Sequence, residues 1–122
     1  ASDVYKRQEF NHIRDFKGYD HPFVVDGWKP NILGEVGTLR EPRSGRSVTV
    51  LSSQPSVMIY TGNWLAGGCP ETKTGGRYND YDGVAIECQN YPDAVNHPDF
   101  PSPLLRPGEL YCQKIVFRFG TF

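Results

Sequence analysis

The stretch RSVTVLSSQPSVMIY, residues 46–60, carries the clearest signal of the fold class. In its first half, Val48 and Val50 share one face of a β-strand, because successive side chains in a strand point to opposite faces. Pro55 follows that half, and the four apolar residues 57–60 come next. A short run that is apolar on both faces is typical of an interior strand. The stretch therefore predicts two β-strands separated by a proline.

Strand-like segments continue on both sides of this stretch. Residues 33–41 are separated from residues 46–53 by Pro-Arg-Ser-Gly, in which Gly45 allows the positive φ that a hairpin turn requires. Further strands are expected at residues 23–25, 84–89 and 109–119. Because apolar residues nowhere recur at helical spacing over three turns, the pattern predicts an all-β domain, an antiparallel β-sandwich or part of one.

Two long connections interrupt the strands, at residues 65–82 and 90–108. Each exceeds the ~12–15 residues above which structureless loops become uncommon, and loops of this length are usually functional or disordered. The second contains five prolines, which stiffen its backbone. We therefore expect the second connection to be an ordered loop.

Composition excludes several classes of protein. The 122 residues suit one domain, and 13 basic and 14 acidic residues are spread along the chain, which argues against a nucleic-acid partner. No apolar run approaches the ~18 residues of a membrane-spanning helix. Cys69, Cys88 and Cys112 lack paired spacing, and the three histidines lack ligand spacing, so neither a disulfide framework nor a metal site is expected. Free thiols indicate a cytoplasmic protein.

The first eight residues differ from the rest of the chain. Residues 1–8 show neither strand nor helix periodicity and end in Lys-Arg-Gln. We interpret them as a tag or another non-native leader, and the expected fold begins at residue 9.

Glu87 is the most informative single residue. It lies inside the apolar segment VAIECQ, residues 84–89, where a buried carboxylate without partners would be costly. Strand alternation puts Ala85, Glu87 and Gln89 on one face, so Glu87 either faces solvent or lines a site. In a site, partial burial would raise its pKa toward the range of a general base. This pattern alone leaves both placements open.

Two other segments place polar and aromatic side chains at strand ends. YDHPF, residues 19–23, sets Asp20 beside a histidine, where an Asp that caps backbone amides is the simpler interpretation. YTGNW begins at Tyr60 and contains Asn63, an aromatic and an amide group of the kind that sugar sites use. Its tryptophan is typical of a core or loop anchor.

Five motifs in sequence order resemble those of the aldose 1-epimerase, or galactose mutarotase, family. The first is YDHPF, the second is YTGNW extended to QPSVMIYTGNWL, and the third is GVAIECQ around Glu87. The proline-rich connection supplies YPDAVNHPDFP and LRPGE. In order, the motifs occupy residues 19–23, 54–65, 83–89, 91–101 and 105–109. Each motif is weak alone, whereas five in order are specific.

The resemblance implies an isomerase with a large antiparallel β-sandwich. Such an enzyme interconverts the α and β anomers of hexoses such as galactose and glucose without a cofactor, so a monosaccharide is the expected partner. At matching positions, Glu87 resembles the general base and Asp20 resembles the residue that binds sugar hydroxyls. We expect Tyr60, Asn63 and Gln89 to contribute to substrate binding.

The family's general acid lies outside the matched motifs. A histidine acid, with a second histidine and an arginine that bind the sugar, belongs to a region upstream of them. Residues 9–122 are therefore expected to form the C-terminal part of a single sandwich domain that is truncated at its N-terminus. We expect this part to require an upstream segment of the same domain and to be inactive alone.

The chain departs from the family pattern at two positions. Tyr-Asp-Gly precedes the glutamate strand in place of a His-Ser-Gly-like turn, and Cys88 replaces the usual threonine, so the preferred sugar stays open. A hexose 6-phosphate epimerase of the same fold is one alternative, and it would require arginines directed at the phosphate, with Arg77 and Arg106 as candidates. A sugar-binding β-sandwich without catalysis is the other.

Overall fold

The computed structural model describes residues 17–68 and 71–122. The leader expected at residues 1–8 lies outside these residues, as do His12 and Cys69, so the interpretations given for them stay predictions. The elements described are β1 (Asp20–Val24), β2 (Gly34–Glu41), β3 (Arg46–Ser52), β4 (Ser56–Tyr60), β5 (Ala85–Gln89), a short 3-10 helix η1 (Ala94–Asn96) and β6 (Ile115–Thr121).

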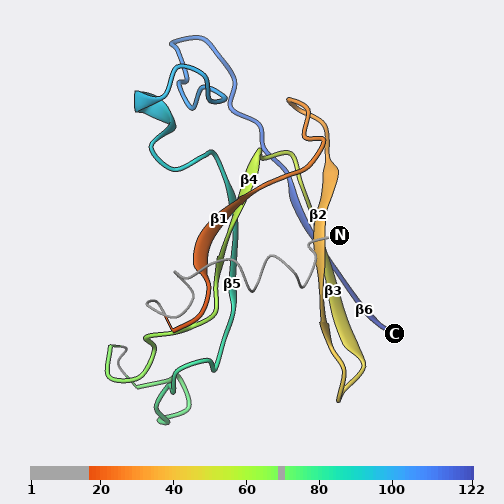
Figure 1. Cartoon of the computed structure of the whole chain (residues 1–122), viewed down its shortest axis with the longest axis vertical. Helices are drawn as coiled ribbons and strands as arrows, with labels where there is room; N and C mark the ends of the chain where they lie inside the picture. Colours follow the sequence, from red (N-terminus) through yellow and green to blue (C-terminus); the bar gives the residue numbers. More distant parts are fainter. Residues whose placement is uncertain (1–16, 69–70) are drawn as a thin grey trace. The chain divides into compact units, whose positions relative to one another are not determined.

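Strands β2, β3 and β6 form one antiparallel sheet in that order (Figure 1). The β2–β3 hairpin turns at Gly45, which has φ of 69° and donates its amide to the Glu41 carbonyl at 3.0 Å. The Glu41 carboxylate also accepts hydrogen bonds from the amides of Arg43 at 3.0 Å and Ser44 at 2.7 Å. These bonds close the turn, and the expected hairpin is confirmed.

One face of this sheet is largely apolar. The register pairs Val48 with Leu39 on one side and with Phe119 on the other, and it pairs Val50 with Phe117. Val50 is 3 % exposed, whereas Phe119 is 79 % exposed. Within the described residues, the outer strand β6 therefore leaves its aromatic side chains uncovered.

Strands β1, β4 and β5 form the other sheet, with β4 between β1 and β5. The Thr61 amide donates to the Tyr19 carbonyl at 3.1 Å, and the Val25 amide donates to the Pro55 carbonyl at 3.0 Å. Residue numbers therefore rise along β1 while those of the paired residues fall along β4. This correspondence makes β1 and β4 antiparallel.

Strands β4 and β5 are also paired in antiparallel orientation. Ser56 Oγ donates to the Gln89 carbonyl at 2.8 Å. Gly62 lies against Gly83, because a Cβ atom at Gly62 would be 2.7 Å from the Gly83 carbonyl oxygen. Both sheets are therefore antiparallel, and the expected all-β fold of the β-sandwich class is confirmed.

The chain divides into two compact units. Among the described residues, the first unit contains residues 22–57 and 88–122, and the second contains residues 17–21, 58–68 and 71–87. Strands β2, β3 and β6 belong wholly to the first unit. The candidate residues Asp20, Tyr60, Asn63 and Glu87 belong to the second unit, and Gln89 belongs to the first.

The β3–β4 corner, residues 52–57, is buried although most of its residues are polar. Ser52 and Ser56 are each 1 % exposed, and Gln54 is 5 % exposed. Ser52 Oγ accepts a hydrogen bond from the Gln54 amide at 3.0 Å, and Ser56 Oγ donates to the Gln89 carbonyl. These hydrogen bonds offset the cost of removing the serine hydroxyls from water.

The last strand is shorter than the sequence predicts. Strand β6 begins at Ile115, so the expectation of a strand is wrong for residues 109–114. There the chain bonds to the corner instead: the Lys114 amide donates to Ser53 Oγ at 2.9 Å, and Ser53 Oγ donates to Gln113 Oε1 at 2.5 Å. Strand β3 has already ended at this level, so a regular ladder has no partner strand.

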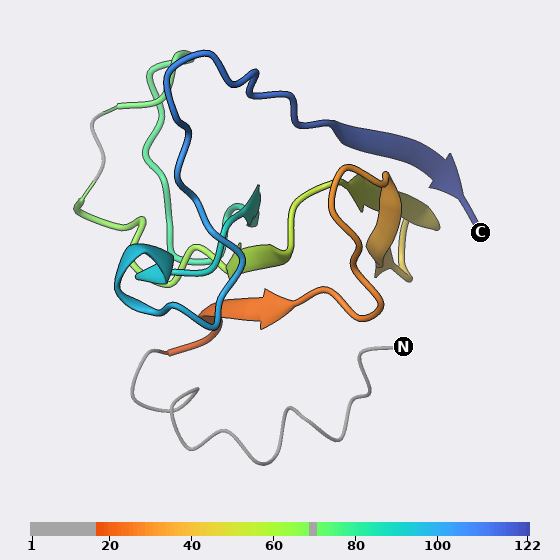
Figure 2. The ribbon, with the colours of Figure 1, turned by 90° about the horizontal axis from the view of Figure 1, so that it is seen from above.

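The connection between β5 and β6 is ordered around η1 (Figure 2). His97 Nε2 lies 3.2 Å from Asp93 Oδ2, and the His97 ring stacks on Phe100 with 4.8 Å between centroids. The expectation of an ordered loop agrees with these contacts. In residues 17–68 and 71–122, no helix is long and apolar enough to cross a membrane.

Candidate active site

Asp20 and Tyr60 lie opposite each other in the second unit. The bond between the Thr61 amide and the Tyr19 carbonyl fixes the pairing of β1 with β4, because paired residue numbers have a constant sum in an antiparallel ladder. The next pair along the ladder is Asp20 and Tyr60. Side chains that are directly opposite project to the same face of a sheet. These two side chains therefore share one face.

Glu87 projects from the same face. Taking Gly62 and Gly83, whose backbones approach closely, as opposite residues pairs Met58 with Glu87 by the same count. Met58 is two residues from Tyr60, so both side chains point to one side. In an ideal sheet, with a strand spacing of ~4.8 Å and a rise of ~3.3 Å per residue, this pairing would put the Cα atoms of Asp20 and Glu87 about 12 Å apart.

This face is open in the described chain. Asp20 and Glu87 are exposed, whereas the next residues along their strands are half-buried His21 and buried Cys88. The alternation agrees with the pairing derived above. Glu87 is thus exposed within the described residues, and its expected role in a site stays a prediction. Burial instead raises the pKa of the Cys88 thiol on the opposite face.

Tyr60 is half-buried and fixes the loop that follows β4. Its hydroxyl oxygen accepts a hydrogen bond from the Trp64 amide at 3.0 Å, which leaves the hydroxyl proton available for donation. Trp64 is 51 % exposed, and Lys17 Nζ lies 3.9 Å from the centroid of its ring. This cation–π contact makes Trp64 an anchor of the loop and not of the core.

Asn63 is fully buried, at 0 % exposure. Its Nδ2 donates to the Tyr19 carbonyl at 2.9 Å, and its Oδ1 accepts from Thr61 Oγ1 at 2.5 Å. The absence of a side chain at Gly18 permits this packing, because a Cβ atom there would lie 2.5 Å from Asn63 Oδ1. Asn63 thus holds the residue that precedes Asp20. Its expected contact with a sugar stays a prediction.

Gln89 belongs to the first unit and is half-buried. Its carbonyl accepts the hydrogen bond from Ser56, which fixes the end of β5 against the β3–β4 corner. The Gln89 side chain follows that of Glu87 by two residues and therefore projects from the same face of β5. Its expected contact with a sugar also stays a prediction.

Gln54 belongs to the second family motif but was not predicted as a site residue. Its side-chain Nε2 donates to the Tyr111 hydroxyl at 3.1 Å, whereas its buried Oε1 has no hydrogen-bond partner among the described residues. A buried acceptor without a partner is unusual in a folded protein and requires an explanation. No periodicity or spacing in the sequence indicates this property, because it arises from the buried corner.

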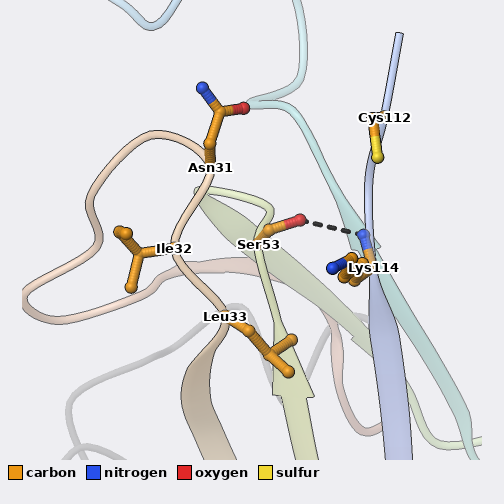
Figure 3. Close-up of a pocket in the computed structure, with 6 residues that line it drawn as sticks. All are labelled: Asn31, Ile32, Leu33, Ser53, Cys112 and Lys114. Atoms are coloured by element: carbon orange, nitrogen blue, oxygen red, sulfur yellow. Dashed lines mark hydrogen bonds between the residues drawn. The ribbon is translucent and has the colours of Figure 1, made fainter.

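A pocket of about 330 Å³ in the first unit contains none of the predicted site residues. Figure 3 shows Ser53 Oγ in this pocket already bonded to the Lys114 amide at 2.9 Å. The residues that line it are Asn31, Ile32, Leu33, Ser53, Cys112 and Lys114. None of these side chains is a carboxylate or an imidazole, so we assign the pocket no role in proton transfer.

Arg106, a candidate for phosphate binding, is engaged within the chain. Its amide donates to Glu109 Oε2 at 2.8 Å, and its Nη1 lies 4.0 Å from Glu109 Oε1. These contacts favour a structural role for Arg106. Among residues 17–68 and 71–122, no three His, Cys, Asp or Glu side chains gather where they could hold a metal ion.

Comparison with known proteins gives the same family as the motifs. The sequence model of the family described as aldose 1-epimerase matches residues 2–118. Galactose mutarotase from Homo sapiens is 41 % identical over 124 aligned residues, and that from Mus musculus is 39 % identical over the same length. Aldose 1-epimerase from Haemophilus influenzae is 39 % identical over 107 residues. The chain therefore belongs to the aldose 1-epimerase family.

These matches cover most of this chain but only a minor part of each relative. The human and mouse alignments cover 99 % of this chain but 35 % of each relative, and the Haemophilus influenzae alignment covers 84 % of the chain and 29 % of the relative. The chain thus spans about a third of the length of the relatives that it matches. The resemblance inferred from the five motifs is confirmed.

Proposed function

We propose that the protein containing this chain is an isomerase that interconverts the α and β anomers of a hexose such as galactose or glucose, with Glu87 as general base. One observation carries the proposal: the pairing of the strands puts Asp20 and Glu87 on one exposed face of the β1-β4-β5 sheet. Membership of the aldose 1-epimerase family supports the reaction class.

The reaction requires two proton transfers at the sugar. The base removes the proton of the anomeric hydroxyl. The oxygen of that hydroxyl then forms the carbonyl of an aldehyde, and the bond between C1 and the ring oxygen breaks. An acid donates a proton to the released ring oxygen. Rotation about the bond between C1 and C2, followed by ring closure, gives either anomer and returns both protons. Each transfer by a positioned group contributes about 10²–10⁴-fold in rate.

The second unit supplies groups for the base and for sugar binding. Glu87 is exposed and acceptor-only when ionised, as the base role requires. Asp20 is proposed to accept hydrogen bonds from hydroxyls of a ring lying between the two carboxylates. Tyr60, opposite Asp20, can donate its hydroxyl proton to the same ring. Asn63, and Gln89 of the first unit, are also proposed to bind the sugar.

The acid is proposed to come from outside this chain, as the family resemblance implies. A segment upstream of the matched motifs would then complete the site and act as partner of the chain. We also propose a cytoplasmic location, which agrees with the free thiols of buried Cys88 and exposed Cys112. The chain alone is expected to show no catalysis above buffer, because a base without its acid loses most of the rate enhancement.

Glu87→Gln in the longest natural protein that contains this chain tests the proposal. The amide keeps the shape of the carboxylate and loses its basicity, so kcat is expected to fall by at least ~10²-fold. Polarimetry on freshly dissolved α-galactose measures the rate. Glu35→Gln, at an exposed strand position in the first unit, is the matched control and is expected to change nothing. A Glu87→Gln protein that retains most of its activity would exclude Glu87 as the base.

A further inference from the structure

Tyr81 connects three segments that lie at one end of the β1-β4-β5 sheet. Its backbone amide donates to the Gly62 carbonyl at 2.9 Å, two residues beyond the end of β4. Its hydroxyl donates to the Lys17 carbonyl at 2.7 Å, three residues before β1 begins at Asp20. Tyr81 itself lies four residues before β5 begins. One residue of the second unit is therefore bonded both to the chain that leaves β4 and to the chain that enters β1.

The strand order gives the hydroxyl bond of Tyr81 a role that the ladders do not supply. Strand β4 lies between β1 and β5, so within the described residues no ladder hydrogen bonds join β1 directly to β5. Asp20 is on β1 and Glu87 is on β5. The bond from Tyr81 to Lys17 links the segments that precede these two strands without passing through the β4 ladders. It therefore bears on the separation of the two carboxylates.

The backbone of Tyr81 is held in a conformation that tyrosine rarely adopts. Its φ is 69°, in the left-handed region, where a bulky side chain costs conformational energy. Tyr81 is 57 % exposed, so burial of its ring does not offset this cost. Strained backbones persist where surrounding contacts fix them, and they gather at functional sites. The hydrogen bonds to Gly62 and Lys17 are contacts of this kind.

Lys17 is fixed at its side chain as well as at its carbonyl. Its Nζ lies 3.9 Å from the centroid of the Trp64 ring, which belongs to the loop after β4. The next anchor toward Asp20 is Tyr19, whose amide donates to Thr61 Oγ1 at 2.9 Å. Loss of the bond at the Lys17 carbonyl would therefore loosen the approach to Asp20 without separating β1 from β4.

We propose that Tyr81 is a positioning residue for sugar binding: its hydroxyl bond to Lys17 sets where the Asp20 carboxylate lies relative to Glu87. This inference rests on the proposed function, in which Asp20 binds hydroxyls of the sugar and Glu87 is the base. Tyr81 acts through Asp20 and needs no contact with the sugar. Loss of the Tyr81 hydroxyl leaves the backbone bond to Gly62, so the turn before β5 and Glu87 stay in place. The effect is therefore expected in binding and not in proton transfer.

Tyr81→Phe tests this role in the longest natural protein that contains the chain. The KM for galactose is expected to rise about two- to tenfold, the range of one neutral hydrogen bond, with kcat unchanged. In an Asp20→Asn background the same substitution is expected to have no further effect on KM, because both changes act on one contact. Tyr78→Phe is the matched control, since Tyr78 is an exposed tyrosine of the same connection whose hydroxyl takes no part in these bonds. An unchanged KM, an equal rise in the Asp20→Asn background, or a fall in kcat as large as the rise in KM would overturn the inference.

Hydrogen exchange on the same protein separates this inference from the proposed function. The backbone amides of residues 19–24 are expected to exchange faster in Tyr81→Phe than in the wild type, whereas those of residues 46–52 in the first unit keep their rates. Tyr78→Phe is expected to change neither segment. Equal exchange of residues 19–24 in the wild type and in Tyr81→Phe would refute the role of Tyr81 even if the protein is an active epimerase. Absence of anomerisation by the wild-type protein would refute the proposed function, while the exchange rates would still report whether Tyr81 holds the segment that leads to Asp20.

Discussion

The β3–β4 corner and strand β6 both belong to the first unit, but different interactions hold them. In the corner, Ser52 and Ser56 are each 1 % exposed, and their hydroxyls bond to backbone groups. In β6 every residue is exposed, including Phe117 at 44 % and Phe119 at 79 %. Polar residues are thus buried where the backbone satisfies them, whereas the aromatic residues of β6 are exposed within the described residues.

This contrast indicates what stabilises the described chain. Its buried hydrophobic residues are small or medium in size: Val25, Val50, Val57, Cys88 and Ala94. Larger apolar side chains such as those of β6 contribute little burial, so the hydrophobic effect acts weakly there. Buried hydrogen bonds such as those of the corner therefore contribute to the specificity of the fold, because an unmade bond inside a protein costs more than an exposed one.

The largest effect on stability is expected at Asn63, which is the most buried polar residue that the structure describes. Asn63→Leu keeps a similar size but removes the hydrogen bonds to Thr61 Oγ1 and the Tyr19 carbonyl. We expect the free energy of unfolding to fall by about 2–3 kcal/mol, since two partly buried groups lose a partner. Urea denaturation followed by circular dichroism measures this change. Asn96→Leu is the exposed control, because Asn96 is exposed and its side chain bonds to neighbouring Asp93. Equal losses in both variants would contradict the weight given to burial.

A smaller effect on stability is expected at Glu41, whose hydrogen bonds are exposed to solvent. Bonds from Ser44 and from the Arg43 amide lower the pKa of this carboxyl from 4.5 to about 2. A lowered pKa in the folded state means that the stabilisation is present above pH 4.5 and is lost as the pH falls toward about 2. Solvent screens an exposed group, so the loss is small.

Glu41→Gln isolates this contribution. The variant is expected to have a lower Tm than the wild type at pH 6, and the difference is expected to shrink as the pH falls from 4.5 to 2. Thermal unfolding at several pH values, at constant ionic strength, measures the difference. A gap in Tm that stays constant down to pH 2 would show that the Glu41 carboxylate does not stabilise the hairpin.

The sequence predicted strands better than it predicted exposure. Alternation and turn residues located β3, β4 and the hairpin at Gly45, because these signals are local. The start of β6 was misplaced, since the strand begins where a partner strand is available and not where apolar residues begin. Glu87 was located by its position in a strand, but its exposure depends on neighbouring strands. The half-satisfied amide of Gln54 depends on Tyr111, which is distant in sequence and therefore carries no local signal.

The smallest effect on stability is expected at Phe119. Phe119→Ser removes an aromatic side chain that is 79 % exposed, so the free energy of unfolding should change by no more than about 0.5 kcal/mol. Val50→Ser makes the same kind of change on the same face of the sheet at a position that is 3 % exposed, and it is expected to cost about 2–3 kcal/mol. The two variants therefore compare burial directly while the face and the new residue stay constant.

Phe119 should instead affect association. An exposed apolar strand at the edge of a sheet promotes dye binding and concentration-dependent self-association. Phe119→Ser is therefore expected to lower the fluorescence of a bound hydrophobic dye and to raise the concentration at which the chain aggregates, as measured by light scattering. Wild-type and Phe119→Ser chains that bind the dye equally would mean that the β6 face is already covered in solution. In that case Phe119→Ser should destabilise the chain as much as Val50→Ser, so the urea transition midpoints of the two variants decide between an open face and a covered one.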